Sequence, residues 1–291
     1  MNDTAQQKSE RSAVLRYTAF DVDGQGGNPA GVVLDSRGMD AARMQEIAAE
    51  VGFSETAFLL DDGDAGGFRI RYFSPLAEVA FCGHATIATA VALAERQGTG
   101  DLRLVTSAGE IGVETRPANG RILATLTSVA PAVGEVAEAD LTDALTALRW
   151  NAADLDPALP PRIANAGNDH LVLAASSRAR LADLDYDQKS LGELMARRGW
   201  TTIHLVWRET ETVFYARDPF PPGGVVEDPA TGAAAAAFGG YLRALGLITP
   251  PAEFTIHQGQ DMGRPSRLLV EVPSGTTGGI RVSGTAAPIP G

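Results

Sequence analysis

The most informative segment of this chain for its fold is Glu227-Asp228-Pro229-Ala230-Thr231-Gly232, which continues directly into five alanines, residues 233–237. Two carboxylates and a proline-stiffened turn therefore precede a helix of small residues. The first turn of such a helix has unpaired backbone N–H groups and the positive end of the helix dipole, so it can bind an anion. A carboxylate beside an anion site favours chemistry on an acidic substrate. The alternative is that Asp228 is only the N-cap of an alanine-rich core helix.

A second segment has the same design. Phe81-Cys82-Gly83-His84-Ala85-Thr86 precedes a helix of small residues that we expect to stop at Gly98, and each helix is followed by a strand pair broken by glycine. Helices this rich in alanine need close packing on several sides. We therefore expect two related α/β domains, each built around one central helix, with both helix N-termini at a cleft between them.

Length and composition agree with this plan. The chain has 291 residues, 44% of them hydrophobic and 21% charged, as in a globular protein that buries a core. A net charge of −12 argues against nucleic acid or an anionic membrane as a partner. One cysteine excludes an internal disulfide and fits a cytoplasmic location. The polar residues 1–11 lack the apolar core of a signal peptide, and we expect them to fray.

Hydrophobic periodicity and turn residues predict the order of elements. We expect an N-terminal domain over residues 12–128, completed by a C-terminal strand near 279–290, and a C-terminal domain over 129–278. The expected helices are 40–51, 87–96, 141–148, 190–198 and 233–245. The expected strands are 13–20, 30–34, 53–60, 68–73, 102–106, 111–114, 122–126, 171–174, 203–208, 212–216, 254–257 and 268–272.

Glu55 is the first candidate for chemistry. It is the one charged residue in the segment Phe53-Ser54-Glu55-Thr56-Ala57-Phe58. Apolar surroundings destabilise a carboxylate and raise its pKa, which suits a general acid/base. The alternative is a glutamate at a strand edge whose carboxylate reaches solvent.

His84 is the second candidate, because a histidine at a helix start can bind or protonate a substrate; it could equally cap its own helix. Cys82 also precedes this helix, where a thiol pKa can be lowered. Two-base racemases need a second cysteine, which this chain lacks. We expect Asp228 at the corresponding place, and we expect Cys82 to pack against its neighbours.

His204 is expected in the core, and no metal-binding spacing links the histidines. Because of the histidine spacing, we expect no metal. The glycines of residues 24–27 lack the spacing of a nucleotide loop, so we also expect no cofactor.

The motifs together resemble the PhzF-like family of phenazine-biosynthesis isomerases and their relatives, which share the diaminopimelate-epimerase fold. The resemblance extends over residues 13–282 in family order. It is carried by Gly27-Asn28-Pro29-Ala30, Ser54-Glu55-Thr56, the Cys82-Gly83-His84 segment, the Glu227–Gly232 segment and Gln258-Gly259 with Met262-Gly263-Arg264-Pro265.

The resemblance implies two pseudo-symmetric domains, each a curved, mostly antiparallel sheet around a central helix. It implies a cofactor-independent isomerase, commonly a homodimer, that moves a proton and a double bond on a small cyclic carboxylic acid. Glu55 would be the general acid/base, and His84 and Asp228 would bind and polarise the substrate. The substrate would also contact the other residues that match the family's binding segments: Asn28, Gly83, Thr231, Gly232 and Ala233.

One residue departs from the family pattern. Members with the phenazine activity often have serine directly after the Thr-Gly pair, where this chain has Ala233. Because this hydroxyl is missing, the sequence fits another carboxylate of specialised metabolism as well as it fits the phenazine substrate. Two other functions also remain open: an epimerase or racemase acting next to a carboxylate, and a catalytically silent protein that binds a small acid.

Overall fold

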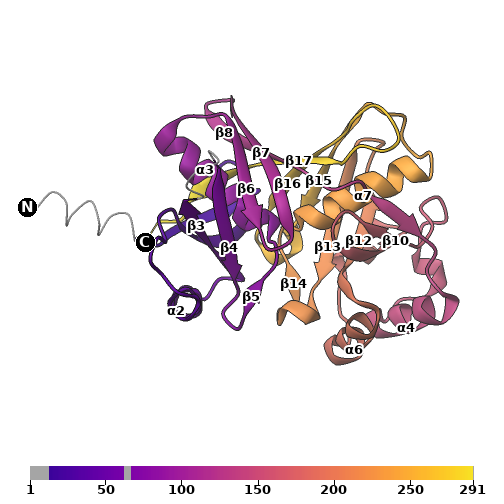
Figure 1. Ribbon diagram of the computed structural model, residues 1–291. Coiled ribbons are helices and arrows are strands. Elements are labelled where there is room, and N and C mark those ends of the chain that lie inside the picture. The colour runs from indigo at the N-terminus through magenta and orange to yellow at the C-terminus, as the bar shows by residue number, and fades with distance from the viewer. Residues whose placement is uncertain (1–12, 62–66, 291) are drawn as a thin grey trace, which may run out of the picture. The chain divides into compact units, whose positions relative to one another are not determined.

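The computed structural model describes residues 13–61 and 67–290 (Figure 1). The chain divides into two compact units: the first ends at Thr127 and resumes at Ser283, and the second is Ser128–Val282. The N-terminal residues 1–11, which we expected to fray, lie outside the described part. Among the described residues, no helix is long and apolar enough to cross a membrane.

The first unit contains two helices of the described chain and a mostly antiparallel sheet, into which the end of β17 (Arg281–Pro288) is also paired. Its helices are α2 (Ala41–Val51) and α3 (Gly83–Gln97). Its strands are β1 (Leu15–Ala19), β2 (Asn28–Val33), β3 (Glu55–Asp61), β4 (Phe68–Phe73), β5 (Glu78–Val79), β6 (Asp101–Thr106), β7 (Gly109–Ala118) and β8 (Arg121–Thr127).

The second unit repeats this design with more helices. Its helices are α4 (Glu138–Leu148), α5 (Arg178–Ala182), α6 (Gln188–Arg198) and α7 (Gly232–Ala244), with 3-10 turns at Ala152–Asp154, Pro221–Gly223 and Gln260–Met262. Its strands are β9 (Ala132–Gly134), β10 (Arg162–Asn165), β11 (Asp169–Ala174), β12 (Trp200–Arg208), β13 (Val213–Pro219), β14 (Glu227–Asp228), β15 (Ala252–Gln258) and β16 (Ser266–Val272).

Strand pairing shows that the two units share one topology. In the first unit, β1–β2 is antiparallel, β2–β3 parallel, β3–β4 and β4–β5 antiparallel, β4–β6 parallel and β6–β7 antiparallel. In the second unit the same order of pairings joins β10, β11, β12, β13, β14, β15 and β16. In both units a two-residue strand, β5 or β14, comes directly before the long small-residue helix. The internal repeat expected from the sequence is therefore present.

The two small-residue helices are the centres of their units. In α3 every residue from His84 to Ala94 is buried, and the helix contacts β1, β2, β3, β7 and β8. In α7 the buried run extends from Ala234 to Leu242, and the helix contacts β9, β10, β11 and β16. Short side chains let the surrounding strands approach a helix on all sides. Gly240 shows how closely, since a Cβ there would lie 2.4 Å from Pro131.

Two boundaries differ from the sequence-based expectation. The helices begin at Gly83 and Gly232. The first start is about one turn, and the second one residue, earlier than the apolar pattern predicts. The pattern misses these starts because glycine has a low helix propensity, whereas packing in the folded chain holds these turns in the helix. Asp228 is not the N-cap of α7: that position is Thr231, and Asp228 lies in β14, paired with Asp218 of β13. The very short strands β5, β9 and β14, together with β10 and α5, have no counterpart among the expected elements.

Candidate active site

Glu55 is the first residue of β3, at the end of the strand that lies beside β2. The two strands approach closely because Gly31 of β2 has no side chain: a Cβ there would lie 2.5 Å from Oγ1 of Thr56. The Glu55 side chain is only 14% exposed. Burial raises its pKa above the ordinary 4.5, and hydrogen bonds to Ser54 and Cys82 partly oppose that shift. The alternative of a solvated strand-edge glutamate therefore does not hold.

His84 is the second residue of α3, and both of its ring nitrogens have polar neighbours. Nδ1 lies 3.1 Å from Nδ2 of Asn28. Nε2 lies 3.3 Å from Oγ of Ser54 and 3.4 Å from Oε2 of Glu55. Contacts at both ring nitrogens fix the orientation of the His84 ring. They keep its Nε2 beside the Glu55 carboxylate. A residue that only capped its own helix would not make these contacts.

Asn28 is positioned by the glycine-rich turn before β2. The residue is 1% exposed and is the first of its strand. Gly27, directly before it, has φ +72°, and a Cβ there would lie 2.4 Å from Oγ1 of Thr18. Only glycine fits this conformation and this space. The glycines that resemble a weak nucleotide loop thus serve to present Asn28 to His84.

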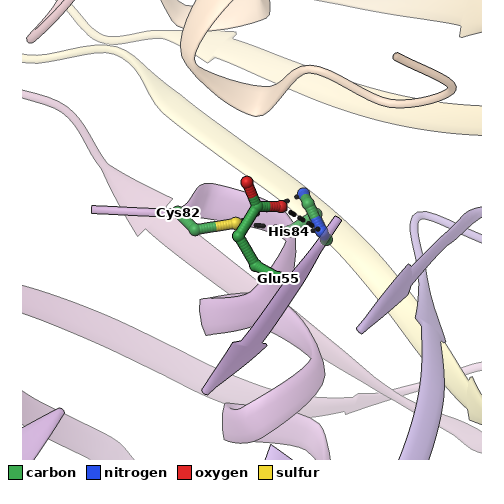
Figure 2. Close-up of side chains that lie close together, drawn as sticks. All are labelled: Glu55, Cys82 and His84. Carbon is green, nitrogen blue, oxygen red and sulfur yellow. Dashed lines mark hydrogen bonds and ion pairs between the residues drawn. The ribbon is translucent and has the colours of Figure 1, made fainter. Parts of the chain in front are cut away.

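Cys82 also lies beside His84. The sequence-based expectation, that Cys82 only packs against its neighbours, missed this contact. Its thiol is buried, and Sγ lies 3.4 Å from Nδ1 and 3.8 Å from Nε2 of His84. Figure 2 shows the side chains of Glu55, Cys82 and His84 pointing toward one another, from the start of β3, the residue before α3 and the first turn of α3. Cys82 and Gly83 also begin a helix that has no side-chain N-cap bond. Its first backbone N–H groups have no partners within the helix, which is the arrangement that binds anions.

In the second unit, Asp228 belongs to a compact hydrogen-bonded group at the start of α7. Its Oδ2 accepts a 2.6 Å hydrogen bond from Oγ1 of Thr231. Gln258 of β15 secures the turn: its Nε2 donates to the backbone oxygen of Asp228 at 2.8 Å, and its Oε1 accepts from N of Thr231 at 3.0 Å. Gly232 and Ala233 are the first two residues of the helix that follows. The sequence marked Gln258 only as part of a segment that resembles the family, and its role in holding this turn was not predicted.

Glu227 has a structural partner. Its carboxylate accepts two hydrogen bonds from Arg217, at 3.0 Å from Nε and 2.5 Å from Nη2. Burial raises the pKa of Glu227, and Arg217 opposes the shift. The guanidinium also donates to the backbone oxygen of Ala182 at 2.7 Å. This pair anchors β14 and so the position of Asp228, which follows Glu227 directly.

His204 lies in the core, as expected. It is fully buried, and its Nδ1 lies 3.1 Å from both carboxylate oxygens of Asp218. Thr202 links the same carboxylate to His170, with Oγ1 2.8 Å from Oδ1 of Asp218 and 2.8 Å from Nδ1 of His170. Burial lowers the pKa of His170 to about 3, which keeps this ring neutral. The group is an internal polar network of the second unit.

Comparisons with known proteins agree with the fold and the sequence motifs. The family model described as phenazine biosynthesis-like protein matches residues 17–290. The chain therefore belongs to this family, and it shares the two-domain fold of diaminopimelate epimerase. A probable proline racemase of Agrobacterium radiobacter K84, 14% identical, has the same fold, with a TM-score of 0.66 over 95% of this chain and 90% of that one.

More similar relatives are isomerases by name. The trans-2,3-dihydro-3-hydroxyanthranilate isomerase of Pseudomonas chlororaphis is 33% identical over 84% of each chain. An isomerase of Mesorhizobium japonicum is 32% identical over 94% of this chain and 96% of its own length. The solved structure of a PhzF-family phenazine biosynthesis protein from Bacillus anthracis is 28% identical, with a TM-score of 0.86 over 95% and 96% of the two chains. The enzyme class is thus that of the isomerases.

Proposed function

We propose that the chain is a cofactor-independent isomerase that moves a proton, and with it a double bond, on a small cyclic carboxylic acid. Glu55 is the general acid/base of this proposal. The observation that carries it is the burial of the Glu55 carboxylate beside His84, with a raised pKa. A carboxyl group with its pKa nearer to neutrality takes up and returns a proton more readily than a solvated one.

In this mechanism the carboxylate of Glu55 removes a proton from one carbon of the substrate and returns it, or a hydrogen exchanged with the solvent, to another carbon. His84 lies 3.4 Å from that carboxylate and polarises a heteroatom substituent of the substrate. The backbone N–H groups at Gly83 and His84 hold the substrate carboxylate at the positive end of α3. Asn28 and Ser54 keep the His84 ring in the required orientation.

The second unit contributes substrate binding in this proposal. Asp228, held by Thr231 and Gln258, orients an amino or hydroxyl substituent, and the start of α7 at Gly232 and Ala233 offers a second anion site. The native protein is proposed to be a homodimer, as the family resemblance implies, and to act in the cytoplasm, which its one cysteine fits. Light scattering on the purified protein tests the dimer.

The Pseudomonas chlororaphis relative suggests the first compound to try, trans-2,3-dihydro-3-hydroxyanthranilate. The experiment is turnover in deuterated water, followed by NMR. Deuterium at a carbon other than the original donor supports isomerisation with a double-bond shift. Deuterium at the original stereocentre with inverted configuration supports the epimerase alternative, and recovery of every compound in a panel of cyclic carboxylic acids both unlabelled and unchanged contradicts both.

A further inference from the structure

The side chains of Glu55, Cys82 and His84 bring three different metal-binding groups together. Their ligand atoms, a carboxylate oxygen, Sγ and a ring nitrogen, all lie within 4.8 Å of one another (Figure 2). Zinc is bound by thiolate at about 2.3 Å and by imidazole or carboxylate at about 2.0–2.2 Å. Ligands at tetrahedral angles around one zinc ion are then roughly 3.3–3.6 Å apart.

The observed separations are close to these values. Oε2 of Glu55 lies 3.4 Å from Nε2 of His84, and Sγ of Cys82 lies 3.8 Å from the same nitrogen. Sγ lies nearer to Nδ1, at 3.4 Å, so the thiol has to turn toward the Nε2 edge of the ring before one ion can bind all three atoms. We propose that the cluster binds one divalent ion of the zinc class, through Sγ of Cys82, Nε2 of His84 and a carboxylate oxygen of Glu55, with the fourth coordination position open.

Asn28 supports the proposed site from the Nδ1 side of the His84 ring. A histidine that binds zinc through Nε2 has its proton on Nδ1 and donates it to a neighbouring acceptor. The Asn28 amide lies 3.1 Å from Nδ1 of His84 and is itself buried. Turned over, that amide presents its oxygen to the Nδ1 proton and holds the ring in the orientation that the ion needs.

The ligand set selects the kind of ion. Thiolate and imidazole favour zinc, cobalt or copper, whereas magnesium and calcium prefer oxygen ligands alone. The cluster is buried but not sealed, since the Glu55 side chain remains 14% exposed and Cys82 8% exposed. An ion bound here holds the carboxylate that the proposed reaction uses, so zinc inhibits proton transfer by Glu55.

Metal titration of the tag-free, chelator-treated full-length chain tests the site. Calorimetry with zinc should give one ion per chain, unaffected by a large excess of magnesium. Cobalt should give the near-ultraviolet charge-transfer absorption of a cobalt–thiolate bond. Cys82→Ser and His84→Ala should abolish stoichiometric binding, and Asn28→Ala should weaken it by about 10–100-fold.

His257→Ala is the matched control, because this histidine is half-buried in β15 of the second unit. It should bind zinc as the unchanged protein does, and circular dichroism should show that each variant is folded. Cobalt binding without thiolate absorption, or equal zinc affinity in Cys82→Ser, would overturn the proposal. These readouts need no substrate, so they stand whether or not Glu55 catalyses isomerisation. Zinc that binds without slowing turnover would overturn the inhibitory part.

Discussion

Cys82 and Thr231 occupy the same position in the two units. Each is the N-cap of a long small-residue helix that starts with glycine, α3 in one unit and α7 in the other, and each follows a two-residue strand. We expected Asp228 at the place that corresponds to Cys82, but the shared topology puts Thr231 there. A thiol in one unit and a hydroxyl at the matching position of the other unit are not the pair of thiols that a two-thiol racemase requires, which favours Glu55 as a single proton carrier.

Replacing Glu55 by glutamine tests that role. Glu55→Gln keeps the size of the side chain but removes the group that accepts the proton, so kcat should fall by at least about 10²–10⁴-fold with the fold retained. Steady-state kinetics and circular dichroism measure both effects. Glu50→Gln is the control, since Glu50 is exposed in α2 and should leave kcat unchanged. A Glu55→Gln enzyme within threefold of the original would remove Glu55 from the mechanism.

The pH dependence of kcat/KM should reflect the buried carboxyl. The reaction needs ionised Glu55, so kcat/KM should rise with pH through a midpoint above 4.5, because burial raises this pKa. Ser54 stabilises the charged form by hydrogen bonding. Ser54→Ala should therefore raise the pKa further and move the rising limb to higher pH. A limb that stays in place or moves to lower pH would show that another group titrates.

Asp228 is expected to contribute charge to substrate binding. Asp228→Asn keeps an oxygen that accepts the 2.6 Å hydrogen bond from Thr231, so the local structure should remain. Loss of a charged hydrogen bond to the substrate should lower kcat/KM by about 10–100-fold. Asp143→Asn, at an exposed position of α4, serves as the control. Equal kinetics for the two variants would contradict a substrate contact by Asp228.

The buried pair Arg217–Glu227 should matter for stability. The Arg217 and Glu227 side chains are 10% and 3% exposed, so Arg217→Met leaves a buried carboxylate without its cation. We expect the free energy of unfolding to drop by about 3–5 kcal/mol, measured by urea denaturation. Arg43→Met breaks the exposed Arg43–Glu46 pair and should cost less than about 1 kcal/mol. Similar losses for both would mean that the buried pair has no special role.

Gly27 and Gly38 offer a matched test of the turn that positions Asn28. Both have positive φ, +72° and +82°, but only at Gly27 does a Cβ meet other atoms, 2.4 Å from Thr18 and 2.6 Å from the Ala19 oxygen. Gly38→Ala should cost about 1–2 kcal/mol from backbone strain alone. Gly27→Ala should cost clearly more in the same urea experiment, and it should also lower kcat/KM because it displaces Asn28 from His84.

Local sequence patterns were sufficient for most of the architecture. Apolar periodicity located the long helices and strands, and the strand Phe68–Phe73 agrees to the residue. These elements follow from side-chain spacing along a single segment, so no distant contact is needed to find them. Two-residue strands such as Glu227–Asp228 were missed because they exist only through pairing with another strand.

For the candidate site, the sequence by itself indicated the residues that we propose for the chemistry: Glu55 stands out as the one charged residue of its segment, and His84 and Asp228 stand out by their places beside a helix start. Only the tertiary structure decided their partners. Burial of Glu55, the contacts of Cys82 and Asn28 with His84, and the pairing of Glu227 with Arg217 all join residues distant in sequence or require the folded packing. A carboxyl pKa depends on the solvent and charges around it, and those surroundings form only when the chain has folded.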